Sequence, residues 1–308
     1  MIESHFGLSR RPFPATPDQS TYYPATSHEK VLARLQEALA DGEGMLLLTA
    51  APGLGKTLLS HVLLERLGSG YETSFLIHTH LRDRAGLLQA LLFDLSLPHE
   101  GRSEQEMRLA LIDHLLGKFR EGRRSVLIID EAQHLTADLL EELRLLGNLE
   151  GQGGKAVQVI LVAQPDLLHT LGHPGLLALR QRLAVRLQLD PLGLEEAADY
   201  LLAHLRSAGG RAERILGMET LEVLARQTGG VPRLLNQAGQ VCLRLAAENQ
   251  STEVDVEMAL EAMSLLGLSA EPGDGTPAAS EESVLRLDGT AEAGVSDYRL
   301  FMTTNRSA

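Results

Sequence analysis

The sequence predicts an α/β protein in which a parallel sheet is sandwiched by helices, followed by a small all-helical domain. Short continuous apolar runs alternate with helical patterns up to residue 190, and only helical patterns follow. The chain has 308 residues, enough for one large domain and a smaller one. We therefore expect an α/β domain over 1–190, a helical lid domain over 191–268 and a disordered tail over 269–308, where Gly, Pro, Ser, Ala and acidic residues dominate.

The first domain opens with a loop-like segment over 1–27, which has prolines at positions 12, 14, 17 and 24. Leucines at positions 32, 35 and 39 then predict a helix, because this spacing places them on one face. Short continuous apolar runs over 45–48 and 126–129 predict buried strands of a parallel sheet, and three further strands are predicted over 74–80, 157–162 and 183–189. Helical patterns follow each of the first three strands, over 58–67, 85–97, 103–119 and 136–147. A capping box of Ser103 and Glu106 marks the start of the third of these helices.

The second domain contains four predicted helices, over 194–207, 219–227, 233–248 and 252–265. The one cysteine, Cys242, lies within an apolar pattern of the third helix. A single cysteine excludes an intrachain disulfide, and its apolar neighbours predict a buried structural thiol.

Charge and hydropathy narrow the classes of partner. The formal net charge is −13, which disfavours a broad basic face for nucleic acid. The amino terminus has no apolar signal-peptide core, and no apolar run approaches the roughly 18 residues of a membrane span. We therefore expect a cytoplasmic protein without a transmembrane segment.

The segment Ala-Ala-Pro-Gly-Leu-Gly-Lys-Thr (50–57) follows a predicted buried strand and begins a helix, which is the context of a phosphate-binding P-loop. Backbone N–H groups in such a loop converge on the phosphates, aided by the helix dipole. Lys56 would reach the β- and γ-phosphates of ATP, and the Thr57 hydroxyl would bind Mg²⁺. The first position is Ala50 rather than glycine, which is costly if φ there is positive. The alternative is a glycine-rich turn without a ligand. The predicted nucleotide-binding residues of this segment are Ala51, Pro52, Gly53, Leu54, Gly55, Lys56, Thr57 and Leu58.

Two acidic residues, Asp130 and Glu131, end the predicted strand over 126–129. Asp130 would hold Mg²⁺, and Glu131 would polarise the water that attacks the phosphate. A neighbouring cation also explains two adjacent carboxylates, because it offsets their repulsion. The alternative is that the two acids form the first turn of a helix. The P-loop earlier in the chain favours the Mg²⁺ site over this alternative.

Several ordered motifs resemble the general secretion pathway protein A (ExeA) group of AAA+ ATPases, over about residues 1 to 265. The opening segment contributes Phe6-Gly-Leu, Pro12-Phe13, Thr16-Pro17-Asp18 and Ser27-His28. The remaining motifs are Asp-Glu-Ala-Gln (130–133), Leu-Leu-Glu-Glu-Leu-Arg-Leu-Leu-Gly-Asn-Leu-Glu (139–150), Val-Ala-Gln-Pro-Asp-Leu (162–167), Leu-Arg-Gln-Arg-Leu (179–183) and Thr-Gly-Gly-Val-Pro-Arg-Leu-Leu-Asn (228–236). The chain is also similar, less closely, to transposition-helper ATPases of the TniB and TnsC kind.

The resemblance implies roles for three further polar residues. Gln164 would be the polar sensor near the γ-phosphate, with a strand-terminal turn as the alternative. Arg182 would be an arginine finger that acts on ATP bound by a neighbouring subunit, with Arg180 as the competing choice. Arg233 would be a second sensor that reaches the γ-phosphate from the lid. For both Arg182 and Arg233, the alternative is an arginine facing solvent.

The early aromatic segment would frame the adenine base of ATP. Tyr22, Tyr23 and His28 are the candidates, with Val231-Pro232 on the side of the lid. The alternative is ordinary packing of loop aromatics. Tyr23 and His28 complete the predicted nucleotide-binding set.

These residues predict an Mg²⁺-dependent ATPase that forms homo-oligomers and remodels, loads or recruits an unknown protein partner complex. The alternative is an ATP-gated binding switch with slow hydrolysis. A further variant recruits to DNA, as transposition helpers do. The acidic net charge disfavours DNA binding. The intact Lys56, Asp130 and Glu131 favour the enzyme.

Overall fold

A computed structural model describes residues 2–14, 19–77 and 81–268. The predicted tail over 269–308 lies outside these residues, as do the motif at 16–18 and the end of the strand expected over 74–80. Within the described ranges, no helix is both long and apolar enough to cross a membrane.

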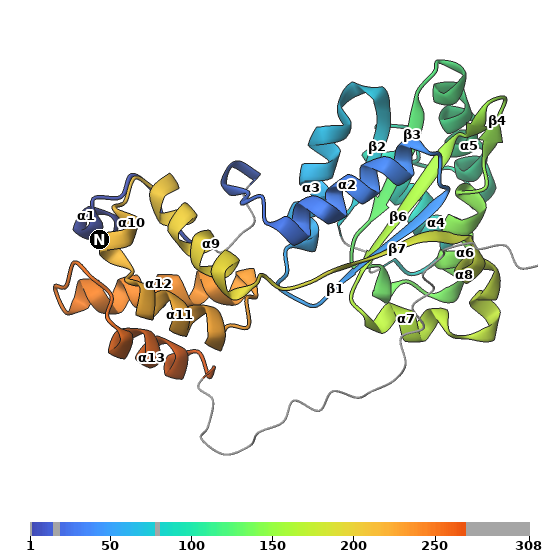
Figure 1. The fold of residues 1–308 in the computed structure, drawn as a ribbon. Helices are drawn as coiled ribbons and strands as arrows, with labels where there is room; N and C mark the ends of the chain where they lie inside the picture. Colours follow the sequence, from blue (N-terminus) through green and yellow to red (C-terminus); the bar gives the residue numbers. More distant parts are fainter. Residues whose placement is uncertain (1, 15–18, 78–80, 269–308) are drawn as a thin grey trace, which may run out of the picture. The chain divides into compact units, whose positions relative to one another are not determined.

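Five parallel strands form the central sheet: β1 (Met45–Ala50), β2 (Tyr71–Leu76), β3 (Arg124–Ile129), β6 (Val157–Ala163) and β7 (Leu183–Leu189). Their order is β2-β3-β6-β1-β7, so the first strand of the chain lies between β6 and the edge strand β7 (Figure 1). The residues of β1 and β6 are buried throughout. The prediction of a parallel sheet with helices is therefore confirmed.

The alternation of side chains along each strand divides the core into two clusters. Leu46 and Leu48 join a cluster with α2 (Thr26–Ala40) and α3 (Lys56–Leu67). Met45 and Leu47 face a larger cluster on the other side of the sheet. The helices of that larger cluster are α4 (Arg84–Asp94), α5 (Glu104–Arg120), α6 (Ala137–Leu146), α7 (Asp166–Leu171) and α8 (Leu177–Arg182).

The predicted capping box at the start of α5 is present, because Ser103 and Glu106 exchange side-chain and backbone hydrogen bonds. Two features of this region were not predicted. A small hairpin joins β4 (Glu150–Gly151) and β5 (Gly154–Lys155). The helices α7 and α8 have six residues each, which is too short for a repeating apolar pattern to reveal them.

The helical part contains α9 (Leu194–Ser207), α10 (Ala212–Ile215), α11 (Met218–Gln227), α12 (Pro232–Glu248) and α13 (Val256–Leu265). Its fourth predicted helix begins later than expected, because Asp255 caps α13 and Val254 forms a β-bridge with Leu216. Cys242 is fully buried, and burial raises the pKa of its thiol to about 12. The prediction of a buried thiol is confirmed.

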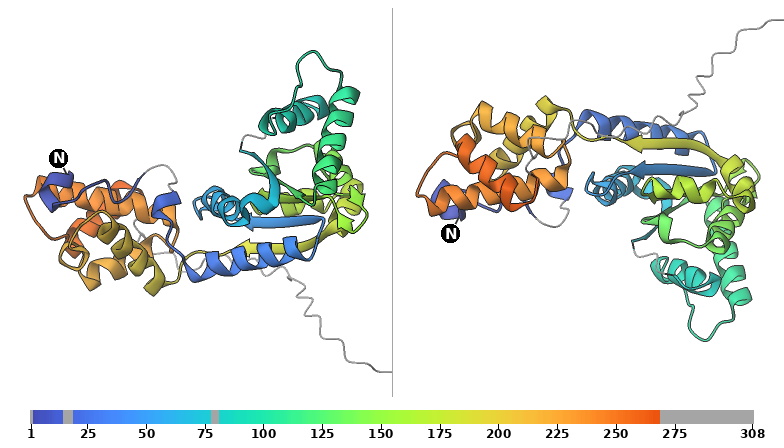
Figure 2. Two further views of the ribbon diagram at one scale, coloured as in Figure 1. Left: turned by 90° about the horizontal axis from the view of Figure 1, so that it is seen from above. Right: turned by 90° about the horizontal axis from the view of Figure 1, so that it is seen from below.

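The amino-terminal segment differs from the expected loop. It contains α1 (Ile2–Phe6) and a 3₁₀ turn, η1 (Gln19–Thr21), and α1 lies against α12 (Figure 1 and Figure 2). Leu8 and Phe13 are buried in the hydrophobic cluster of the helical part. A loop over the whole of 1–27 is therefore wrong: Leu8 and Phe13 anchor the segment to helices that come far later in the sequence.

Candidate nucleotide-binding site

The P-loop connects the end of β1 to the start of α3. Gly53 and Gly55 have φ values of 86° and 93°, a left-handed conformation that favours glycine. A Cβ atom at Gly53 would lie 3.0 Å from the side chains of Val231 and Arg233, so close packing also requires glycine there. Ala50 belongs to β1 and is not among the described residues with positive φ. The alanine at the first motif position therefore carries no left-handed strain.

Lys56 lies at the first position of α3 and is 6% exposed. Its Nζ donates hydrogen bonds to the carbonyl oxygens of Ala50 and Ala51, at 2.9 and 3.4 Å. Burial lowers the pKa of the Lys56 ammonium, and the carboxylates of Glu131 and Asp130 oppose that effect. The loop thus holds a buried cation beside its own backbone.

The adjacent Thr57 joins the P-loop to the end of β3. Its hydroxyl donates a hydrogen bond of 2.6 Å to Oδ2 of Asp130, which is fully buried. Oδ1 of Asp130 accepts the backbone N–H of Glu131 at 2.8 Å. Burial raises the pKa of the Asp130 carboxyl, although these two hydrogen bonds lower it. A hydroxyl beside a carboxylate is a set of hard oxygen donors that fits Mg²⁺.

Glu131 has left-handed backbone angles, φ 53° and ψ 37°, in the residue that directly follows Asp130. Its Oε2 accepts hydrogen bonds from the side-chain amides of Gln133 and Gln164. Burial alone would raise the pKa of Glu131, but these hydrogen bonds and the positive charge of Lys56 outweigh it and hold the pKa below its usual value. The carboxylate is therefore charged at neutral pH.

Gln133 was not among the predicted site residues. It was visible in the motif Asp-Glu-Ala-Gln, but no periodicity indicated the direction of its side chain. The structure places it in the turn η3 (Ala132–His134), where its amide contacts both Glu131 and the backbone of Gln164.

A cavity of about 740 Å³ extends from the P-loop to the helical part. The following predicted residues line it: Tyr23, His28, Pro52, Gly53, Leu54, Gly55, Lys56, Thr57, Leu58, Glu131, Gln164 and Arg233. Ala51 and Asp130 do not line the cavity themselves. Each accepts a hydrogen bond from a residue that lines it, Ala51 from Lys56 and Asp130 from Thr57. We call Lys56, Thr57, Asp130, Glu131 and Gln164 the sheet-edge cluster, since all lie at or just after the carboxyl ends of β1, β3 and β6.

The side chains proposed to frame adenine have other contacts as well. Nε2 of the buried His28 donates to the carbonyl oxygen of Leu54 at 3.0 Å, so this histidine also supports the P-loop. Burial lowers the pKa of His28, which favours the neutral ring. The Tyr22 hydroxyl donates to Glu29 at 2.9 Å. Tyr23 packs edge-on against Tyr200, with ring centroids 5.7 Å apart.

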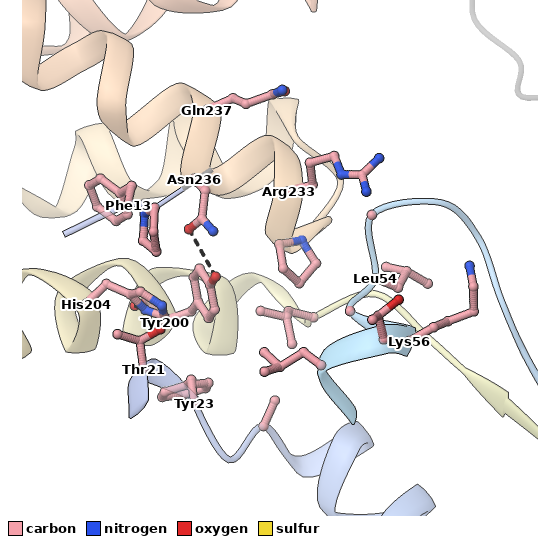
Figure 3. Close-up of a pocket in the computed structure, with 18 of the residues that line it drawn as sticks. Phe13, Thr21, Tyr23, Leu54, Lys56, Tyr200, His204, Arg233, Asn236 and Gln237 are labelled. Atoms are coloured by element: carbon pink, nitrogen blue, oxygen red, sulfur yellow. Dashed lines mark hydrogen bonds between the residues drawn. The ribbon is translucent and has the colours of Figure 1, made fainter. Parts of the chain in front are cut away.

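The far side of the cavity is formed by residues that were not among the predicted site residues. We call Phe13, Tyr200, His204 and Asn236 the helical wall (Figure 3). The Tyr200 hydroxyl donates to Oδ1 of Asn236 at 3.0 Å. The ring centroids of Tyr200 and His204 lie 4.1 Å apart. Tyr200 and His204 are four residues apart on α9 and so share one face of the helix. This spacing is equally typical of residues that only pack in a core, so it did not indicate a binding site.

Arg182 is the predicted residue that the structure leaves apart from the others. It ends α8, is exposed, and does not line the cavity of its own chain. The pKa of Glu150 is lowered mainly by the hydrogen bond and the charge of Lys155. The positive charge of Arg182 lowers it further. Arg180, its competitor, accepts a hydrogen bond from Arg186 through its backbone carbonyl.

Comparison with known proteins gives consistent results. Residues 38–171 match the family model of an AAA domain. Over 96% of its length the chain is 36% identical to general secretion pathway protein A of Aeromonas hydrophila. The chain spans about half, 51%, of that relative.

Solved structures share the fold at low sequence identity. Cdc6p of Pyrobaculum aerophilum matches with a TM-score of 0.65 and 20% identity, over 80% of this chain and 71% of that one. The ORC2 protein of Aeropyrum pernix, in ADPNP and ADP complexes, matches with a TM-score of 0.64 and 17% identity, over 84% and 72%. The strand order, the P-loop and these matches together confirm the AAA+ fold of P-loop NTPases, with an AAA domain over 38–171. Over nearly its whole length the chain is similar to general secretion pathway protein A.

Proposed function

We propose that this protein binds ATP and hydrolyses it with Mg²⁺, and that the reaction drives the remodelling, loading or recruitment of a protein partner. One observation carries the proposal: the Thr57 hydroxyl, the buried Asp130 and the charged Glu131 meet beside the P-loop. A P-loop alone would support binding. The adjacent pair of carboxylates, each with a different environment, supports hydrolysis.

The pKa shifts of the two carboxylates have opposite directions, which fits two different tasks. Asp130 is buried and its pKa is raised, so a bound cation would stabilise its charged form. Glu131 is partly exposed to the cavity and its pKa is lowered. It would therefore be ionised at neutral pH, ready to orient a water and accept its proton.

The residues around these carboxylates would bind and orient ATP. Backbone N–H groups of the P-loop and the ammonium of Lys56 would neutralise phosphate charge. The amide of Gln164 would hydrogen-bond the terminal phosphate. Thr57 and Asp130 would hold Mg²⁺, which would offset the charge on the phosphate oxygens.

Arg182 gives the reason to propose an oligomer. It is exposed and lies outside the cavity of its own chain. An arginine that faces a neighbouring subunit could complete that subunit's site and stabilise the charge of the transferred phosphoryl group. We propose that each site takes Lys56, Asp130 and Glu131 from one chain and Arg182 from the next.

Release of phosphate from ATP, with and without Mg²⁺, tests this function. We expect turnover by the parent protein that requires Mg²⁺. Glu131→Gln should bind ATP normally and lose about 10²–10⁴-fold in rate. Glu261→Gln, an exposed glutamate of α13, is the matched control and should hydrolyse ATP at the parent rate.

Two outcomes would contradict the proposal. Glu131→Gln at the parent rate would remove Glu131 from the mechanism. A parent protein that binds ATP tightly but releases no phosphate, with or without candidate partners or DNA, would favour the ATP-gated switch instead.

A further inference from the structure

We propose that Gln133 is a positioning residue for ATP hydrolysis: its side-chain amide fixes the carboxylate of Glu131 against the end of β6. This inference rests on the proposed function. It adds a residue whose task is to hold the water-orienting carboxylate in place.

The Gln133 amide uses both of its ends. Its Nε2 donates to Oε2 of Glu131, and its Oε1 accepts the backbone N–H of Gln164 at 3.0 Å. Gln164 in turn donates from its own side chain to the same Oε2 of Glu131, at 3.4 Å. The three residues therefore close a ring of hydrogen bonds between the end of β3 and the end of β6.

Gln133 is not needed to form the turn in which it lies. Backbone hydrogen bonds already close that turn, from His134 N–H to the Glu131 carbonyl at 3.0 Å and from Leu135 N–H to the Ala132 carbonyl at 3.1 Å. Ala132 and Leu135 anchor the turn in the core, where they are 0% and 4% exposed. The hydrogen bond from the Gln133 side chain to Glu131 is therefore not required to form the turn.

Glu131 needs such a contact. Its side chain has three rotatable bonds and lies partly exposed at the cavity, so without partners it would sample several rotamers. A carboxylate that orients water must be held in one geometry, because a small displacement of a reacting group costs much of the rate. Gln133 supplies that restraint, and it ties Glu131 to the same strand end that carries the predicted γ-phosphate sensor, Gln164.

A glutamine suits this place because it offers a donor and an acceptor on one rigid plane. Methionine has nearly the same length and cannot replace either hydrogen bond. Glutamate could still accept from the Gln164 backbone, but it would repel Glu131. Gln133→Met and Gln133→Glu therefore remove the contact to Glu131 in two different ways while they preserve side-chain length.

The test measures single-turnover hydrolysis and ATP affinity separately. We expect Gln133→Met and Gln133→Glu to hydrolyse ATP about 10–100-fold more slowly than the parent, the usual cost of losing an outer partner of an active-site group. ATP affinity and melting temperature should stay at parent values. Gln105→Met, at an exposed position of α5, is the matched control.

A double variant decides whether Gln133 acts through Glu131. In the Glu131→Gln background, adding Gln133→Met should cost little or nothing further, because the carboxylate that Gln133 positions is already gone. The same loss in both backgrounds would overturn the inference, as would parent-rate hydrolysis by Gln133→Met. If Glu131→Gln is inactive while Gln133→Met is not, only this inference fails. A parent protein without turnover would overturn both it and the proposed function.

Discussion

The sheet-edge cluster and the helical wall border the same cavity with opposite chemistry. The sheet-edge cluster holds a buried cation, which donates to the backbone at the end of β1, and two carboxylates, which accept hydrogen bonds from neighbouring groups. The helical wall is aromatic and uncharged, with one amide held by a tyrosine hydroxyl. Charged groups that are fixed in place suit phosphate chemistry, whereas aromatic rings and an amide suit the binding of a flat base.

This difference predicts separate consequences of mutation. Changes in the sheet-edge cluster, or in residues that complete it, should affect turnover or the binding of phosphate. Changes in the helical wall should affect stability or the affinity for the base. The following four variants test that separation, beginning with the largest expected effect.

Arg182→Ala should reduce turnover by about 10³–10⁵-fold, because a finger cation stabilises transferred charge. ATP binding should be normal, since Arg182 does not line the cavity of its own chain. Phosphate release measures the rate, and calorimetry measures the affinity. Mixed with Glu131→Gln under conditions where labelled subunits exchange, Arg182→Ala should recover part of the activity, increasingly so at higher protein concentration.

That recovery depends on sites that combine an intact Glu131 with an intact Arg182 from different chains. If exchange is demonstrated and no activity returns at any ratio, the shared-site mechanism is wrong. Arg180→Ala in the same mixing experiment separates the two neighbouring arginines.

Phe13→Ala should lower the free energy of unfolding by about 3–5 kcal/mol, the typical cost of deleting a buried aromatic side chain. Phe13 is 1% exposed and packs against Gly239 of α12, where an added Cβ would approach its ring to 2.7 Å. Chemical denaturation measures the loss. Phe93→Ala is the control, since Phe93 is 71% exposed, and a similar loss in both variants would show that Phe13 has no special anchoring role.

Lys56→Ala should weaken ATP binding by about 10–100-fold or more, because a charged hydrogen bond to phosphate contributes about 1.5–3 kcal/mol. Calorimetric titration with ATP measures it. Lys30→Ala, at an exposed position on α2, should bind as the parent does. Unchanged affinity in Lys56→Ala would contradict the P-loop assignment.

Asn236→Ala should have the smallest effect, a loss of ATP affinity of about 3–10-fold, as expected for one neutral hydrogen bond. Turnover at saturating ATP should not change. Tyr200→Phe removes only the hydroxyl that orients this amide, so a weaker effect in the same direction is expected. If Asn236→Ala lowers turnover at saturating ATP without changing ATP affinity, the proposed division of roles between the two regions is wrong.

The same difference explains how much the sequence could predict. The P-loop and the Asp130–Glu131 pair were predictable because their chemistry is local: each lies at the end of an apolar strand, in a few consecutive residues. The strand over 183–189 and the helix over 194–207 match the observed β7 and α9. Apolar runs, alternating apolar positions as in β7, and helical periodicity were therefore sufficient to predict these long elements.

The helical wall was beyond such reasoning because it is assembled from distant segments. Phe13 meets α12 across more than two hundred positions of sequence, and no local pattern encodes that meeting. The proline-rich composition around it predicted a loop, whereas its burial against Gly239 determines its place. Gln133 was missed for a related reason, since its amide contacts the backbone of Gln164, 31 positions later in the sequence.

The backbone of Glu131 has a consequence for attempts to improve this protein. Its left-handed conformation is one that glycine or asparagine adopts at lower cost, so conformational energy is stored at the residue proposed to orient water. Laboratory selection for thermal stability alone would favour replacement of Glu131, and the selected variants would be more stable but inactive in ATP hydrolysis. Selection that also demands phosphate release should leave position 131 unchanged and accumulate its stabilising changes elsewhere.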